Sequence, residues 1–134
     1  MGNPEGLVLI KVVAAIIEND GKYLLCKRGP GGNCPFLWEF PGGKIEAGES
    51  PFEAIIREIR EELSAEIKPE EIFCEYPFAY PDREIYFYFI RARLLSKDIL
   101  PTFHTEIKWL LPDELESLEY CPADLSTVKK LKGV

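Results

Sequence analysis

Three glutamates lie at helical spacing in the middle of the chain and could together bind a metal ion. Glu58, Glu61 and Glu62 fall within an arc of about 100° if their segment is helical. Like charges at this spacing repel one another by roughly 0.2–0.5 kcal/mol per pair. A cation at their centre removes that repulsion, and oxygen-only ligands favour Mg²⁺ or Mn²⁺. A solvated acidic helix face is the plainer interpretation of the same residues.

The helix that must present these carboxylates has a strong start signal. Ser50 and Glu53 can form a capping box, in which each side chain accepts from the other residue's backbone N–H. Pro51 suits the first helical position, because its missing N–H is not needed there. We therefore predict a helix of about fourteen residues that begins at Pro51. Its buried side should be an apolar stripe formed by Phe52, Ile55, Ile56, Ile59 and Leu63.

A glycine-rich loop, residues 41–49, precedes the helix and must be held against it. Arg57 points to a different helix face from the three glutamates. It can pair there with Glu53 one turn back, or it can bind the loop residue Glu49.

The order and spacing of these residues resemble the signature of the Nudix hydrolases. Gly43, five residues, Glu49, seven residues and the run Arg-Glu-Ile-Arg-Glu-Glu at 57–62 match G-x5-E-x7-R-E-U-x-E-E, where U is aliphatic. The resemblance implies an α/β fold, an α/β/α sandwich with a mixed β-sheet. It also implies an enzyme in which water hydrolyses a nucleoside diphosphate linked to another moiety, with divalent metals bound by the signature.

The resemblance assigns metal binding to residues of this chain. Glu58, Glu61 and Glu62 match the metal-binding carboxylates of the family, and Glu58 and Glu61 match catalytic positions. The backbone carbonyl of Gly42 matches a further metal ligand. The expected cofactor is Mg²⁺ or Mn²⁺, which would neutralise the polyphosphate and lower the pKa of a bound water.

The resemblance also assigns supporting and substrate-binding roles. Glu49 and Arg57 match the pair that braces the loop against the helix and supports catalysis. Lys44 is placed to meet a substrate phosphate, and so are Lys27 and Arg28.

The chain departs from the family pattern at two places. Ser64 stands where glycine is usual, and a left-handed helix end there predicts strain or a rearranged C-cap. Before Trp109 relatives often read E-H-x-E, but Phe103 replaces the leading glutamate. The duty of general base could then pass to a signature glutamate, to Glu106 or to His104. For His104 a surface position in a loop is the favoured interpretation.

Two further runs, 38–44 and 80–83, resemble nucleoside triphosphate pyrophosphohydrolases of the MutT type, which release a nucleoside monophosphate and pyrophosphate. Phe40 matches a base-contacting position in such relatives, and stacking on a base is worth about 1–3 kcal/mol. Core packing explains Phe40 equally well, and it is the favoured interpretation of Trp38.

Asp124 is the residue on which the substrate prediction depends. It falls where the 8-oxo-dGTP enzyme of the family has an asparagine that reads the base. An ionised aspartate can only accept hydrogen bonds, which suits the exocyclic amine of cytosine. We therefore expect CTP or dCTP as substrate, with 8-oxo-dGTP as the next candidate. A simple N-cap of the last helix explains Asp124 equally well.

The remaining segments predict the frame that positions these residues. We expect strands at 7–17 and 23–27, joined by a hairpin turn at 18–21, and then a loop at 29–33 that could act as a lid. Two further strands should lie within 65–78 and 85–94, with a turn at 80–83 between them. A strand at 107–111, a short helix from Pro112 and a last helix at 123–131 complete the prediction. The aromatic run 86–89 predicts a central strand covered on both faces. This order predicts helices on both faces of a mixed sheet.

Length, charge and cysteine content exclude several classes of protein. A chain of 134 residues predicts one domain, 1–134, and a net charge of −7 argues against binding to a nucleic acid duplex. A small-molecule nucleotide stays possible, because a bound divalent ion inverts the local field. The four cysteines lack C-x-x-C spacing, which indicates reduced thiols in the cytoplasm. The longest apolar run, 12–17, is too short to span a membrane.

Of the alternatives from other classes, two remain. The chain has one histidine and no G-x-S-x-G sequence, so a serine hydrolase is not supported, and no P-loop sequence is present. A non-catalytic nucleotide-binding module on the same fold would usually have lost signature carboxylates, which this chain keeps. An enzyme for ADP-ribose or a nucleotide sugar is a second alternative. The protein could be a monomer or a homodimer.

Overall fold

Two long strands form the centre of the protein, whose computed structural model describes residues 9–133. Strands β1 (Ile10–Asn19) and β6 (Arg83–Leu94) run parallel, in register from Ile10 opposite Ile85 to Ile17 opposite Ala92. On its other side β6 pairs antiparallel with β5 (Ile67–Tyr80). The aromatic strand is therefore central, as predicted. Residues 7–8 of the first predicted strand lie outside the described residues.

Tight turns connect neighbouring strands where the sequence predicted them. Strand β1 returns as β2 (Lys22–Lys27) through Asp20 and Gly21, which both have a positive φ, 52° and 78°. Such a pair of φ values is the type I′ geometry that matches the twist of a hairpin. The second turn joins β5 to β6 at residues 81–82.

Three short strands complete one mixed sheet. β3 (Trp38–Glu39) and β7 (Glu106–Leu110) pair antiparallel with the two edges of β2, and β4 (Gly42–Lys44) pairs antiparallel with β1. The main strand order is β3-β2-β1-β6-β5. The predicted mixed sheet is confirmed.

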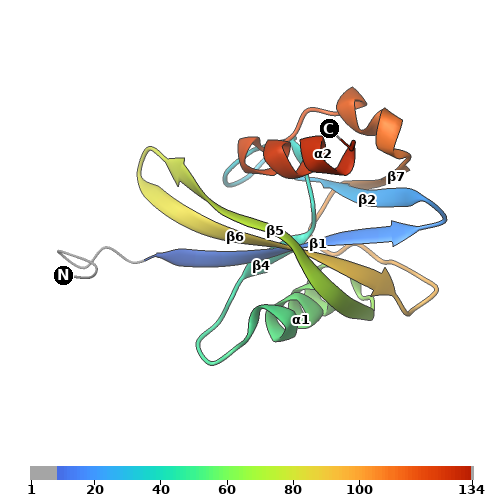
Figure 1. Cartoon of the computed structure of the whole chain (residues 1–134), viewed down its shortest axis with the longest axis horizontal. Coiled ribbons are helices and arrows are strands. Elements are labelled where there is room, and N and C mark those ends of the chain that lie inside the picture. Colours follow the sequence, from blue (N-terminus) through green and yellow to red (C-terminus); the bar gives the residue numbers. More distant parts are fainter. Residues whose placement is uncertain (1–8, 134) are drawn as a thin grey trace.

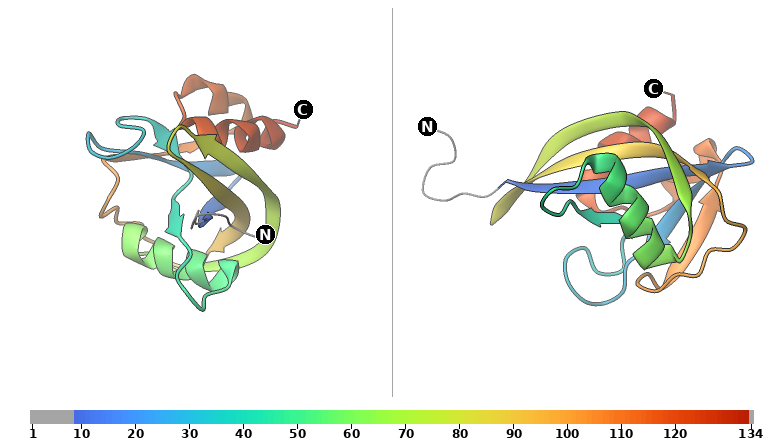
Figure 2. Two further views of the ribbon diagram at one scale, coloured as in Figure 1. Left: turned by 90° about the vertical axis from the view of Figure 1, so that its left-hand side faces the viewer. Right: turned by 90° about the horizontal axis from the view of Figure 1, so that it is seen from below.

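Two helices cover opposite faces of this sheet (Figure 1). α1 (Pro51–Leu63) lies on one face and α2 (Leu125–Leu131) on the other, and Figure 2 shows the same layering from two further sides. Each helix covers its own apolar cluster. The cluster under α1 includes Val13, Ala15, Ile55, Ile59 and Leu63, and the cluster under α2 includes Ile16, Phe40, Phe89, Leu115 and Val128. The predicted α/β/α sandwich is confirmed.

Two details of the helices differ from the prediction. Phe52 is 39% exposed, because Ala54 occupies the buried place in the first turn of α1. The short helix predicted from Pro112 is present as a 3-10 helix, η2 (Pro112–Ser117). α2 begins at Leu125, since residues 122–124 form a separate 3-10 turn, η3 (Pro122–Asp124).

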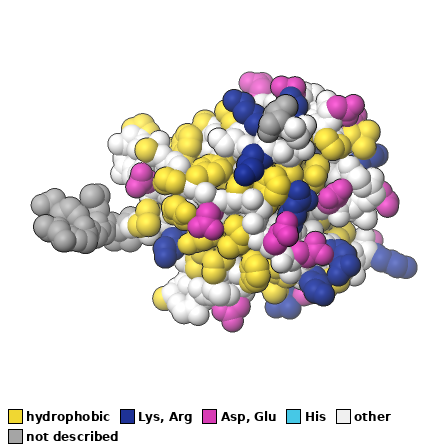
Figure 3. Space-filling view, viewed as in Figure 1, with side chains coloured by type: hydrophobic (Ala, Val, Ile, Leu, Met, Phe, Trp, Pro, Cys, Tyr) yellow, Lys and Arg dark blue, Asp and Glu magenta, His cyan; other side chains and the backbone are white. Residues whose placement is uncertain are grey.

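The surface carries charges of both signs. On the face in Figure 3, acidic side chains are interspersed with lysines and arginines. No helix within residues 9–133 is long and apolar enough to cross a membrane.

Candidate active site

The first turn of α1 is fixed by the predicted capping box. Ser50 Oγ accepts from the N–H of Glu53 at 3.1 Å, and Glu53 Oε1 accepts from the N–H of Ser50 at 2.9 Å. At the other end Ser64 adopts the left-handed conformation, φ 52°, and its N–H donates to Arg60 O at 3.1 Å. The strained C-cap predicted from the missing glycine is therefore present.

Two glycines bring the loop backbone against its neighbours. A Cβ on Gly42 would lie 1.9 Å from the carbonyl oxygen of Val13, and a Cβ on Gly43 would lie 2.5 Å from the carboxylate of Glu58. Neither position tolerates a side chain without movement of the neighbour. The backbone of β4 can therefore approach β1 and the acidic side of α1 only because these residues are glycines.

Arg57 holds the loop to the helix through a bidentate ion pair. Its Nε donates to Glu49 Oε2 at 2.7 Å and its Nη2 donates to Glu49 Oε1 at 2.9 Å. Nη2 also donates to the carbonyl of Lys44 at 3.0 Å. The Arg57 hydrogen bonds, together with the N–H of Glu46, lower the pKa of Glu49 to about 2. The expected pairing with Glu49 is present, while Glu53 is used in the capping box.

The three signature carboxylates differ in their surroundings. Glu58 accepts from Arg57 Nη1 at 3.0 Å, and burial raises its pKa. Glu61 is the most open, with a side chain 59% exposed and an Arg57 contact of 3.2 Å. Glu62 accepts from the N–H of Gly42 at 3.3 Å. Burial raises the pKa of Glu62 to about 8, and nearby carboxylates add to the shift.

This set of donors fits a hard divalent cation. The three side chains and the neighbouring backbone of β4 offer only oxygen ligands, which Mg²⁺ and Mn²⁺ prefer. Burial is the main cause of the raised pKa of Glu62, and the charges of Glu39 and Glu58, which a bound cation would offset, add to it. Within residues 9–133 no three acidic, histidine or cysteine side chains already form a closed metal cage. Glu58 and Glu61 instead contact Arg57.

A cleft runs from this loop to the opposite helical layer. It has a volume of about 220 Å³. Its lining residues include Gly42, Gly43 and Lys44 at one end and Phe40, Cys121 and Asp124 at the other, and Arg28 and Glu39 also line it. Of the three cations expected to meet phosphate, Arg28 and Lys44 line the cleft and Lys27 does not.

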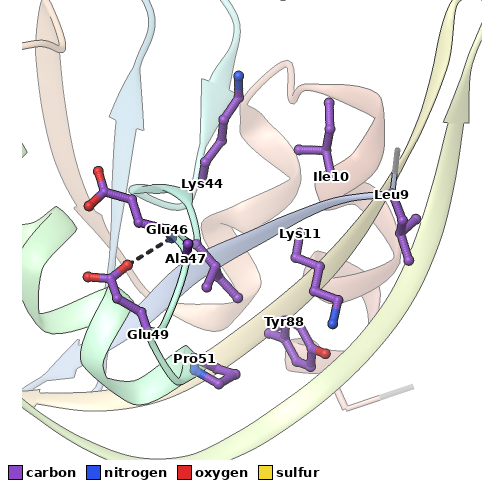
Figure 4. A pocket seen from close by; sticks show the side chains of 10 residues that line it. Leu9, Ile10, Lys11, Lys44, Glu46, Ala47, Glu49, Pro51 and Tyr88 are labelled. Atoms are coloured by element: carbon purple, nitrogen blue, oxygen red, sulfur yellow. Dashed lines mark hydrogen bonds between the residues drawn. The ribbon is translucent and has the colours of Figure 1, made fainter. Parts of the chain in front are cut away.

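A larger hollow of about 460 Å³ lies on the other side of the same loop (Figure 4). Lys11 points toward Tyr88 in this hollow, and Lys44 points away from both. The dashed bond in Figure 4 joins the N–H of Glu46 to Glu49 Oε1, at 2.9 Å. Lys44 therefore borders both cavities, and its side chain points away from the hollow.

Asp124 does not cap the last helix with its side chain. Although it precedes α2, no side-chain cap bond forms, so the capping alternative is wrong. Its Oδ2 accepts instead from the N–H of Phe40 at 2.9 Å. Burial raises the pKa of Asp124 well above its usual value, and Glu39 adds to the shift. The premise of an ionised, accept-only aspartate is therefore not supported in the free protein.

Phe40 borders the cleft but belongs to the core. It is 2% exposed and packs edge-on against Phe89, with ring centroids 6.1 Å apart. Trp38 is also buried, as favoured from the sequence.

Glu39 is a site residue that sequence reasoning missed, and it contacts His104. Glu39 Oε2 lies 2.9 Å from His104 Nε2 and 3.2 Å from Arg28 Nη1. The favoured surface position of His104 is wrong, because its side chain has no exposed area. Phe103, which replaces the expected glutamate, lies against the Arg28 guanidinium, 5.3 Å from its ring centroid. One signal was available: Glu39 is a charged residue between two buried aromatics in the run 38–44.

Comparisons with known proteins agree in family and fold. A family model described as NUDIX domain matches residues 9–131. The chain is 36% identical over 117 residues to a CTP pyrophosphohydrolase of Escherichia coli strain K12, which covers 87% of each chain. It is 32% identical over 127 residues to an 8-oxo-dGTP diphosphatase of Haemophilus influenzae, 92% of this chain and 91% of that one. The solution structure of the E. coli ORF135 protein is similar with a TM-score of 0.81 and 33% identity, over 96% and 91% of the two chains.

Proposed function

Because the chain belongs to the NUDIX family of hydrolases, we propose that it is a Mg²⁺-dependent nucleoside triphosphate pyrophosphohydrolase that prefers CTP or dCTP. Mn²⁺ would serve in place of Mg²⁺. The products would be a nucleoside monophosphate and pyrophosphate. A cytoplasmic location is part of the proposal, in keeping with four free cysteine thiols.

The observation that carries this proposal is a cleft with two different ends. Its glycine-lined end, at Gly42 and Gly43, adjoins the carboxylates of Glu62 and Glu58, and the buried Asp124 lines its other end. Pockets that hold whole drug-sized ligands have volumes of about 300–1000 Å³. A cleft of about 220 Å³ suits one part of a nucleotide, such as its base. The triphosphate would then extend outward past Lys44 toward Glu58, Glu61 and Glu62.

The residues at the acidic end have distinct proposed tasks. Glu58, Glu61 and Glu62, with the carbonyl of Gly42, would hold the metal. When bound, Mg²⁺ supplies charge neutralisation and an acidified water. Glu61, the most exposed of the three, would take the proton of the attacking water.

The surrounding cations and the brace complete this mechanism. Arg57 fixes the positions of Glu49 and Glu58 through its hydrogen bonds. Lys44 and Arg28, which line the cleft, would bind phosphate oxygens that carry the charge of the departing pyrophosphate.

Asp124 is the proposed base-reading residue. Its Oδ2 is occupied by the N–H of Phe40, so Oδ1 is the oxygen left for a base. The cytosine preference therefore requires that Asp124 gives up its proton when the nucleotide binds. Oδ1 would then accept from the exocyclic amine of cytosine. The relative at 36% identity is a CTP pyrophosphohydrolase, which agrees with the cytosine preference.

A second candidate, 8-oxo-dGTP, is favoured by the raised pKa of Asp124. A protonated carboxyl can donate from Oδ1, and O6 of a purine would accept that bond. A relative at 32% identity is named as an 8-oxo-dGTP diphosphatase.

The test is a pyrophosphate-release panel with Mg²⁺ and CTP, dCTP, 8-oxo-dGTP and dGTP, and with ADP-ribose followed by phosphate detection. Preference for cytosine nucleotides supports the proposal, and preference for 8-oxo-dGTP selects the second candidate. No hydrolysis of any compound rejects both and favours a non-catalytic nucleotide-binding module.

A variant pair tests the role of Asp124. Asp124→Asn should change the ratio of kcat/KM between cytosine and purine nucleotides by about tenfold or more, because one hydrogen-bonding pattern is exchanged for another. Asp98→Asn, an exposed residue outside the cleft, is the matched control and should leave the ratio unchanged. Equal ratios in Asp124→Asn and the wild type would reject base reading by this residue.

A further inference from the structure

His104 is the only histidine of the chain, and its ring is completely buried beside the cleft. It follows Phe103, whose ring meets the imidazole edge-on at a centroid distance of 4.9 Å. The next residue, Thr105, donates its N–H to the carbonyl of Lys27 at 3.0 Å. Backbone pairing and aromatic packing therefore hold the imidazole in one place.

The two ring nitrogens of His104 have different surroundings. Nε2 lies 2.9 Å from Glu39 Oε2, whereas Nδ1 is buried without a hydrogen-bond partner among the described residues. A proton on Nδ1 would be a buried donor with no acceptor, which is costly. A proton on Nε2 instead meets a carboxylate. The geometry therefore assigns the proton to Nε2, which donates to Glu39.

Glu39 passes this constraint on to Arg28. Arg28 Nη1 donates to both oxygens of Glu39, at 3.2 and 3.3 Å. On a second side Arg28 Nε donates to the carbonyl of Asn33 at 2.7 Å, and on a third the guanidinium packs on Phe103. Among the described residues Nη2 has no hydrogen-bond partner, and Arg28 lines the cleft.

We propose that His104 is a positioning residue that, through Glu39, fixes the Arg28 guanidinium in the cleft for a phosphate oxygen of the nucleotide. The proposal rests on the proposed function, because it takes a nucleoside triphosphate as the ligand. A flexible arginine would lose rotamer entropy when it binds a ligand. The three contacts already restrict the Arg28 side chain, so less entropy is lost on binding. A planar guanidinium with a fixed Nη2 suits a phosphate oxygen.

A pair of amide variants separates positioning from packing. Glutamine can place its side-chain N–H close to the place of Nε2, while asparagine reaches only to the place of Nδ1. His104→Asn should weaken binding of CTP about five- to tenfold, the effect of one lost hydrogen bond, with kcat changed less than about twofold. His104→Gln should recover most of the wild-type KM. Thermal unfolding of both variants checks that each is folded.

Binding is read most directly as the dissociation constant of a non-hydrolysable α,β-methylene analogue of CTP. A weaker constant in His104→Asn and recovery in His104→Gln support the proposal. Equal constants in the two variants, whether both weakened or both unchanged, overturn it, because packing alone does not depend on the reach of the amide. A loss confined to kcat also overturns it.

A second measurement does not depend on hydrolysis. Since His104 is the only histidine, a two-bond ¹H–¹⁵N correlation spectrum of labelled protein reports one imidazole. The expected pattern is that of the Nε2–H tautomer, and Glu39→Ala should reduce the population of that tautomer. An Nδ1–H tautomer in the wild type, or a spectrum unaffected by Glu39→Ala, overturns the proposal. If no nucleotide is hydrolysed, the proposed function fails while this spectrum still decides whether the His104–Glu39 contact forms.

Discussion

The two ends of the cleft are built in opposite ways. At the end beside α1, the carboxylates and their brace all come from residues 42–62. At the end beside α2, the hydrogen bonds join residues that are 11, 65 and 84 positions apart. One end is therefore specified by helical spacing within a single segment, and the other by how distant strands pair.

Charge differs between the ends in the same way. Near α1 the carboxylates of Glu49, Glu58 and Glu61 share the single guanidinium of Arg57, and burial raises the pKa of Glu62 to about 8. Near α2 the carboxylate of Glu39 has both Arg28 and His104 as partners. The first end lacks positive charge and suits a metal ion, while the second is nearly balanced and suits a base and a phosphate oxygen.

The largest expected effect concerns the α1 end. Glu61→Gln removes a proposed metal ligand and proton acceptor, so kcat should fall by about 10²–10⁴-fold. Nucleotide affinity at the α2 end should change far less. Initial rates and binding of the non-hydrolysable analogue measure the two quantities. Glu70→Gln, an exposed residue of β5, is the matched control. A fall in affinity equal to the fall in kcat would mean that the two ends do not act separately.

The brace gives the next largest effect. Arg57→Lys keeps the charge but loses the two-pronged contact with Glu49, so the loop and the carboxylates should lose their alignment. We expect kcat to fall about ten- to hundredfold, because a small misplacement of active-site groups has an effect of this size. Arg60→Lys, three residues later on α1, breaks only an exposed pair with Glu66 and should have little effect. Similar rates in the two variants would show that the brace is dispensable.

The contrast between the ends explains what could be predicted from the sequence. The capping box, the Arg57–Glu49 pair and the left-handed Ser64 all depend on residues a few positions apart. Local spacing predicts the capping box and offers the Arg57–Glu49 pair, while the family signature, which usually has glycine at position 64, predicts the left-handed end. Phe52 shows the limit of that reasoning, because periodicity does not say whether Phe52 or Ala54 faces the sheet.

The position of His104 depends on strand register and could not be read locally. Glu39 of β3 and Ile107 of β7 both pair with Cys26 of β2, from opposite sides. This register brings the residues before Ile107 near Glu39, although the sequence separates them by 65 positions. The N-cap alternative for Asp124 failed for a similar reason, since the partner of its side chain, the N–H of Phe40, lies in a distant segment.

The pH dependence of stability tests the buried state of Asp124 at the α2 end. Because burial raises its folded pKa, the folded protein keeps a proton that the unfolded chain loses above about pH 4. The contribution of Asp124 to stability should therefore fall as pH rises through this window, by at most about 1.4 kcal/mol per pH unit. Asp124→Asn lacks this titration. Its free energy of unfolding, relative to that of the wild type, should therefore increase with rising pH. Urea unfolding at several pH values measures the difference, and parallel curves would contradict a buried, raised carboxyl.

The smallest expected effect lies at the end of α1, where Ser64 has a φ of 52°. A residue with a Cβ pays roughly 1–2 kcal/mol for this conformation, and glycine does not. Glycine loses more backbone entropy than serine on folding, which offsets part of this gain. Ser64→Gly should therefore stabilise the protein by about 0.5–1 kcal/mol. Ser64→Ala keeps the Cβ and should gain nothing, so the two variants separate backbone strain from loss of the hydroxyl. Thermal unfolding measures both, and an equal shift in the two variants would place the cause in the side chain. Because Ser64 contacts neither end of the cleft, the gain should come without a change in nucleotide preference.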